Sequence, residues 1–88
     1  MKRSEHFLLR SVGGQDLLVP LGSRVLDMNA LMTLNATGRY VWELLAEDRS
    51  EESLVSEVVN RFDVGEERAR ADVRIFLDDL ERLGLLKT

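Results

Sequence analysis

The stretch that decides the fold is residues 34–45, which read Leu-Asn-Ala-Thr-Gly-Arg-Tyr-Val-Trp-Glu-Leu-Leu. Asn35 is favoured at a helix N-cap, because its side chain can accept a hydrogen bond from a free backbone N–H of the first turn. The apolar residues behind it recur with the spacing of one helical stripe, namely Tyr40, Val41, Leu44 and Leu45. The sequence therefore predicts a helix over about residues 36–46 and a change from strand to helix at Asn35.

The first part of the chain carries strand patterns instead. Phe7 to Val12 is a short apolar run that ends at Gly13-Gly14, and Leu17-Leu18-Val19 follows. A Gly-Gly dipeptide accepts the positive φ angles of a tight hairpin turn. We expect a β-hairpin here, followed by a third strand over Met28 to Leu34.

Two more helices are predicted after residue 46. Ser50 with Glu51 and Glu52 opens one that ends near Phe62, since a hydroxyl caps the first turn and acidic residues favour its positive end. Another runs from about residue 66 to 83, with the apolar stripe Ala69, Val73, Phe76, Leu77, Leu80 and Leu83. We expect a single domain over residues 1–88, of α+β class, with a three-stranded antiparallel sheet followed by three helices.

The composition argues against a self-contained enzyme. An 88-residue chain has a marginal core, and a sizeable substrate cleft would compete with it for apolar side chains. There is no cysteine, the single histidine is His6, and adjacent carboxylates such as Glu66-Glu67 diverge on a helix. We therefore expect no catalytic residues, no metal and no cofactor.

The charge also excludes partners. A net charge of −4 has the wrong sign for a domain that neutralises phosphates or anionic lipid. The apolar run Phe7-Leu8-Leu9 is too short for a signal peptide or a membrane helix. We expect a cytoplasmic protein that binds neither nucleic acid nor membrane.

The third strand and its exit are unusual, because residues 28–38 contain no charge. At a sheet edge, such a strand would lack the charge or proline that normally prevents pairing with a stray strand. It could then accept an extended peptide, although an interior strand covered by helices fits the same pattern. Ile75 lies off the apolar stripe of the third helix, beside Arg68, Asp72 and Asp79, where it could line a groove or be a single exposed residue.

Three stretches together resemble the PqqD-like proteins, which are recognition elements for ribosomally made precursor peptides. They are residues 34–45, 49–64 and 72–86. The resemblance implies a winged helix-turn-helix fold and a role as a peptide chaperone. In such proteins, the leader of the precursor adds as a strand to the third strand, in a groove beside the third helix. The core peptide is then presented to a modifying enzyme, often a radical SAM protein, or to a leader protease in lasso peptide systems.

Carried onto this chain, the resemblance implies a peptide-binding site on two elements. The strand residues are Met28, Asn29, Ala30, Leu31, Met32 and Thr33, and the helix residues are Asp72, Ile75, Phe76 and Asp79. The PqqD proteins of quinone synthesis carry a Trp-bearing first hairpin, whereas the first hairpin here has Phe7 as its one aromatic residue. The precursor and the pathway therefore stay open, as does a homodimer.

A winged-helix transcription regulator is the alternative, because one fold class serves both functions. The third helix carries six acidic residues and four arginines, a net charge of −2. A recognition helix that enters a major groove should be basic. The charge of this helix therefore favours peptide over DNA.

Overall fold

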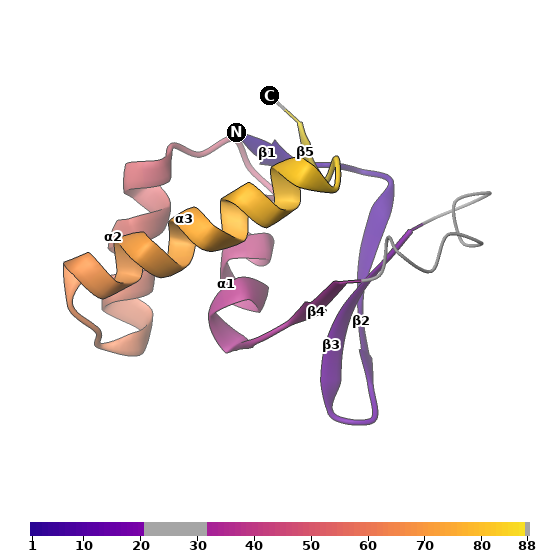
Figure 1. The fold of residues 1–88 in the computed structure, drawn as a ribbon, viewed down its shortest axis with the longest axis horizontal. Helices are drawn as coiled ribbons and strands as arrows, with labels where there is room; N and C mark the ends of the chain where they lie inside the picture. The colour runs from indigo at the N-terminus through magenta and orange to yellow at the C-terminus, as the bar shows by residue number, and fades with distance from the viewer. Residues whose placement is uncertain (21–31, 88) are drawn as a thin grey trace.

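The computed structural model describes residues 1–20 and 32–87. Its main sheet has the order β2-β3-β4, formed by β2 (Phe7–Val12), β3 (Gln15–Pro20) and β4 (Met32–Leu34). The helices α1 (Ala36–Leu44), α2 (Glu51–Phe62) and α3 (Glu66–Arg82) follow. The expected α+β class is confirmed, and the arrangement is that of a winged helix-turn-helix domain, with the β2–β3 hairpin as the wing (Figure 1).

The hairpin forms where the glycine pair predicts it. Gly13 and Gly14 have φ angles of 58° and 83°, a region that side chains with a Cβ rarely adopt. β2 and β3 pair antiparallel across this turn, with Leu9 opposite Leu18. β4 then pairs antiparallel with the other side of β3, with Met32 opposite Leu18, so β4 lies at an edge of the sheet. The expected third strand is therefore confirmed over residues 32–34, while residues 28–31 lie outside the described part of the chain.

Side-chain caps fix the starts of the first two helices. The Asn35 Oδ1 accepts a hydrogen bond from the Gly38 N–H at 2.8 Å, and the Ser50 Oγ accepts one from the Ser53 N–H at 3.1 Å. α1 ends at Leu44, two residues before the expected end, because the Ala46 N–H turns back to the Glu43 carbonyl at 3.2 Å. Because Asn35 directly follows Leu34, its cap starts α1 at the end of β4.

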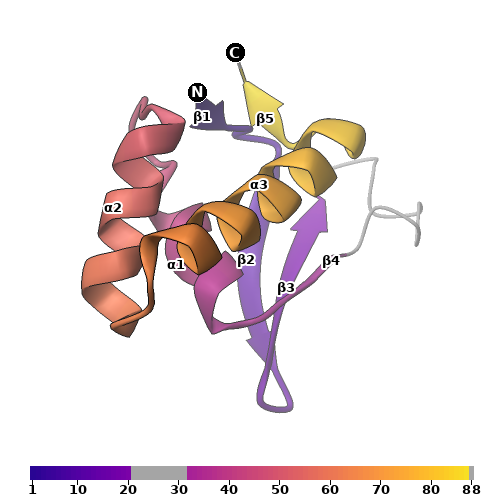
Figure 2. The ribbon, with the colours of Figure 1, turned by 60° about the vertical axis from the view of Figure 1, so that its left-hand side comes forward.

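The core lies between the inner face of the sheet and the three helices. Trp42 is its largest fully buried side chain, at 1% exposure. Around it are buried apolar residues from the sheet and from every helix, including Leu18, Leu45, Leu54, Val73, Leu77 and Leu80. α3 lies in front of α1 in both views (Figures 1 and 2), and residues on one side of α3 border β4 and the start of α1.

A second, two-stranded sheet was not predicted. β1 (Lys2–Arg3) pairs antiparallel with β5 (Leu86–Lys87) and brings the two ends of the chain side by side (Figure 1). The Arg3 guanidinium lies 5.5 Å from the centre of the Trp42 ring and donates to the Trp42 carbonyl at 3.1 Å. The two-residue strands are thereby anchored to the core. Within the described ranges, no helix combines the length and apolar character needed to cross a membrane.

Candidate functional site

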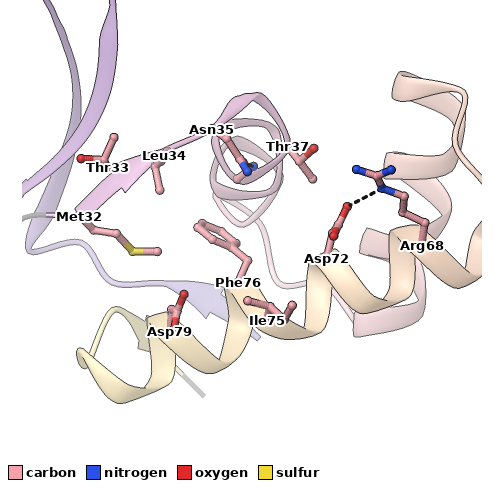
Figure 3. A pocket seen from close by; sticks show the side chains of 11 residues that line it. Met32, Thr33, Leu34, Asn35, Thr37, Arg68, Asp72, Ile75, Phe76 and Asp79 are labelled. Carbon is pink, nitrogen blue, oxygen red and sulfur yellow. Dashed lines mark hydrogen bonds and ion pairs between the residues drawn. The ribbon is translucent and has the colours of Figure 1, made fainter.

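A groove with a volume of about 310 Å³ runs between β4, the start of α1 and α3. Its lining residues come from these three elements and the cap between them (Figure 3). They are Met32, Thr33, Leu34, Asn35, Thr37, Gly38, Arg68, Asp72, Ile75, Phe76 and Asp79. The groove is partly open to solvent, and its lining joins a strand edge to one side of a helix.

β4 forms one wall of the groove and offers it a strand edge. One side of β4 pairs with β3, and within residues 1–20 and 32–87 no strand pairs with the other. The side chains of Met32 and Leu34 point toward Phe76, while Thr33 points away from α3 (Figure 3). The wall therefore combines unpaired main-chain donors and acceptors with apolar side chains, as peptide capture by strand addition requires.

α3 forms the opposite wall, with two apolar residues of different burial. Phe76 is only 8% exposed and belongs to the core, but its ring also forms the floor of the groove. Ile75 is 63% exposed and is one of three large apolar side chains that the described residues leave exposed. An exposed isoleucine beside a strand edge is an apolar contact that a bound peptide could cover.

Gly38 allows the Phe76 ring to lie against α1. A Cβ at this position would stand 3.1 Å from the Phe76 Cε1 and 3.2 Å from the Asn35 Oδ1. Such contacts are tighter than a Cβ normally makes, so with any larger residue the Phe76 ring or the Asn35 side chain would have to shift by a few tenths of an ångström. The glycine of the Leu-Asn-Ala-Thr-Gly stretch thus sets the depth of the groove floor.

The charged residues of the groove differ between its two ends. At one end the Asp72 carboxylate pairs with Arg68 at 3.7 Å, and both residues line the groove (Figure 3). At the other end Asp79 pairs at 3.1 Å with Arg82, which does not line the groove. Ion pairs between exposed side chains contribute little and exchange easily. The arginine partner therefore lies inside the groove at the Asp72 end and outside it at the Asp79 end, where the carboxylate is the one charged group of the lining.

On the face of α3 that packs against α2, arginines of α3 form ion pairs with glutamates of α2. Arg70 donates to Glu52 of α2 at 3.0 Å and to Glu66 at 3.0 Å. Arg74 bonds Glu51 of α2 and, at 2.8 Å, Asp78. The hydrogen bond and charge of Arg70 hold the pKa of Glu52 below its usual range. We call the six residues of these ion pairs the clasp, namely Glu51, Glu52, Glu66, Arg70, Arg74 and Asp78.

Six of the ten residues expected at the site line this one groove, namely Met32, Thr33, Asp72, Ile75, Phe76 and Asp79. The other four, Met28, Asn29, Ala30 and Leu31, lie outside the described residues. Their role as a binding site stays a prediction.

The groove also includes residues that the sequence analysis did not assign to the site. They are Leu34, Asn35, Thr37, Gly38 and Arg68. The first four belong to the stretch that decides the fold, so a residue can cap or space a helix and border a site at once. Among the described residues, no three His, Asp or Glu side chains gather as a metal site would need.

The similarities to known proteins agree with this geometry. The family model described as Coenzyme PQQ synthesis protein D (PqqD) matches residues 5–86. Among solved structures, TbiB1 in complex with the TbiA(beta) leader peptide is similar, with a TM-score of 0.74 and 25% sequence identity. The similarity covers 99% of this chain and 95% of that chain. No curated protein matches the chain. Because the family model spans nearly all of the sequence, from the first hairpin to β5, the chain belongs to the PqqD family.

Proposed function

We propose that this protein binds the leader of a ribosomally made precursor peptide as an added strand along β4. It then presents the attached core peptide to a modifying enzyme, such as a radical SAM protein, or to a leader protease. The observation that carries the proposal is the edge of β4, which no other described strand pairs with and which faces Ile75 and Phe76 across one groove. The solved complex of the similar TbiB1 with a leader peptide supports it. Since precursors are made on ribosomes, the proposed place of action is the cytoplasm.

The energetics of such binding are favourable but moderate. Each main-chain hydrogen bond to β4 contributes about 0.5–1.5 kcal/mol, and apolar contact with Ile75 and Phe76 adds about 25 cal/mol per Å². Ordering a flexible leader costs about 2–5 kcal/mol of this gain. The expected dissociation constant lies between about 10 nM and 10 µM.

The protein itself carries out no chemistry in this proposal. The carboxylates of the groove, Asp72 and Asp79, each pair with an arginine, and the described residues place no histidine beside them. An acid–base pair needs two groups that converge on one reacting atom. Incubation of the purified protein with its precursor should therefore leave the mass of the precursor unchanged unless the partner enzyme is added.

The DNA-binding alternative is disfavoured by the arginines of α3. Each of the four pairs with at least one carboxylate of the protein itself. A phosphate would have to displace these acids from a helix that is already net negative. Fluorescence anisotropy near physiological salt should show no tight, sequence-selective binding to duplex DNA, and such binding would favour the regulator.

Calorimetry tests the proposed function directly. The ligand is the leader of the precursor peptide encoded beside the gene for this protein, and the control is the core peptide of the same precursor. We expect the leader to bind with a micromolar or lower dissociation constant and the core peptide to bind far more weakly. Equal binding of the two peptides, or binding of neither, would contradict the proposal.

A further inference from the structure

We propose that the groove selects leaders in which a lysine or arginine lies two positions from an apolar anchor residue, and that Asp79 reads this charge. The inference rests on the proposed function and adds a specificity to it. It follows from where the side chains of β4 and α3 stand along the groove (Figure 3).

The side chains of β4 determine which residues of a guest strand point into the groove. Side chains opposite each other on neighbouring strands point to the same face of a sheet, and successive ones alternate. Met32 and Leu34 point toward α3, and Thr33 points away (Figure 3). Guest residues beside Met32 and Leu34 therefore point into the groove, and the residue between them points outward.

One position of the groove favours an apolar anchor residue of the guest. The guest residue beside Leu34 meets the Phe76 ring, whose position depends on Gly38. Leu34 is itself buried, and no charged residue other than the Arg68–Asp72 pair lies at this end of the groove. An aliphatic or aromatic side chain is the one that this position stabilises most.

The distance from this anchor to Asp79 determines which guest residue can reach the Asp79 carboxylate. Asp79 is three residues beyond Phe76, which is about 4.5 Å along the helix axis, and it lies at the Met32 end of the groove (Figure 3). The next inward-pointing residue of a guest strand is about 6.6 Å from the anchor. The two spacings differ by about 2 Å, which a long guest side chain can span to reach Asp79.

The charge of Asp79 is balanced from outside the groove, by Arg82 at 3.1 Å. The Asp79 side chain is 35% exposed, and its partner Arg82 is 72% exposed and lies outside the lining. A guest strand would shield Asp79 further from water while the exposed Arg82 stays outside the groove, so a guest cation could share this ion pair or replace Arg82 in it. A guest lysine or arginine can do this while its methylene stem lies along Met32 and Ile75.

A phage-displayed library of random linear dodecapeptides, selected on the immobilised full chain, tests the inference. We expect enriched peptides to combine an apolar residue with a lysine or arginine two positions away. A synthetic copy of an enriched peptide should lose at least tenfold in affinity when this basic residue becomes glutamate.

Two variants with the same change in net charge distinguish a local effect of Asp79 from an effect of the overall charge of the protein. Asp79→Asn should reduce the preference for lysine over glutamine at that position to less than twofold. Glu81→Gln should keep it, because Glu81 is exposed on α3 and does not line the groove. An Asp79→Lys variant should prefer the glutamate peptide.

The outcomes distinguish this inference from the function on which it rests. Enriched peptides with apolar anchors but no basic residue, or an Asp79→Asn variant that keeps the preference, would overturn the role of Asp79 and leave the groove as a peptide site. No enrichment over bare support would overturn peptide capture itself.

Discussion

Two faces of α3 carry the same kinds of residues and use them differently. On the clasp face, Arg70 and Arg74 reach across to glutamates of α2. On the groove face, Asp72 and Asp79 pair only with arginines of their own helix, and Ile75 is left 63% exposed. The ion pairs of α3 thus join two helices on the clasp face but stay within α3 on the groove face, which is the face where we propose that the guest binds.

The largest expected effect comes from a charge on the groove face. Ile75→Asp should weaken leader binding at least tenfold, which is about 1.4 kcal/mol, because it places a carboxylate beside the guest strand. The free energy of unfolding should change little, since Ile75 lies outside the core. Calorimetry with the leader and urea unfolding measure the two quantities.

Val12→Asp is the matched control for this variant. Val12 is also exposed, at 59%, and the same charge is added, but it lies in β2, away from the groove. Its leader affinity should stay within twofold of wild type. An equal loss in both variants would mean that net charge, and not the groove face, governs binding.

A smaller effect is expected from the groove floor. Gly38→Ala should weaken leader binding by about three- to tenfold, or about 0.7–1.4 kcal/mol, because the new Cβ crowds the Phe76 ring. Stability should change by less than about 1 kcal/mol, since the better helix propensity of alanine offsets the tight contact. Binding and stability would then respond differently to one methyl group.

Gly65→Ala controls for the loss of a glycine. Gly65 precedes α3 with a φ of −65°, and a Cβ there would meet nothing within 4 Å. Its leader affinity should equal that of wild type. Unchanged binding in Gly38→Ala would show that the depth of the floor does not matter to the guest.

The smallest effects on binding belong to the clasp. Arg70→Gln should slightly lower the free energy of unfolding, less so at high salt, and leave leader affinity within twofold of wild type. A clear loss of affinity in this variant would mean that the two faces of α3 are coupled.

The clasp should also respond to acid. The pKa of Glu52 is lowered in the folded state, so its contribution is present above the unfolded pKa and is lost as the pH falls through the lowered value. Glu52→Gln should therefore make the free energy of unfolding fall less steeply as the pH is lowered through the acid range. An acid dependence unchanged by this variant, followed by circular dichroism, would contradict the role of the pair.

The parts of the fold that were predicted are those with a local signal. Asn35 and Ser50 cap their helices as expected, and the Gly13-Gly14 turn joins β2 to β3. β1 and β5 could not be predicted, because two-residue strands have no periodicity and their pairing spans the whole chain. Long-range pairing of short segments depends on the packed core, which a local pattern does not encode.

The groove was predictable in outline for the same reason. The off-stripe position of Ile75 and the uncharged strand indicated its two walls, and the structure brings Ile75 and residues 32–34 to one groove. The roles of Gly38 and Arg68 were missed, because they depend on the contact of Gly38 with Phe76 and of Arg68 with Asp72. Distances between side chains on different turns or elements appear only once the chain is folded.

The central claim is that the leader pairs with the open edge of β4, and nuclear Overhauser effects between an isotope-labelled protein and the bound leader test it most directly. We expect cross-strand contacts from the leader backbone to Met32, Thr33 and Leu34, and side-chain contacts to Ile75 and Phe76, with none to β2 at the other edge of the sheet. Contacts to β2, or unchanged amide signals over residues 32–34 at saturation, would contradict strand addition at this groove.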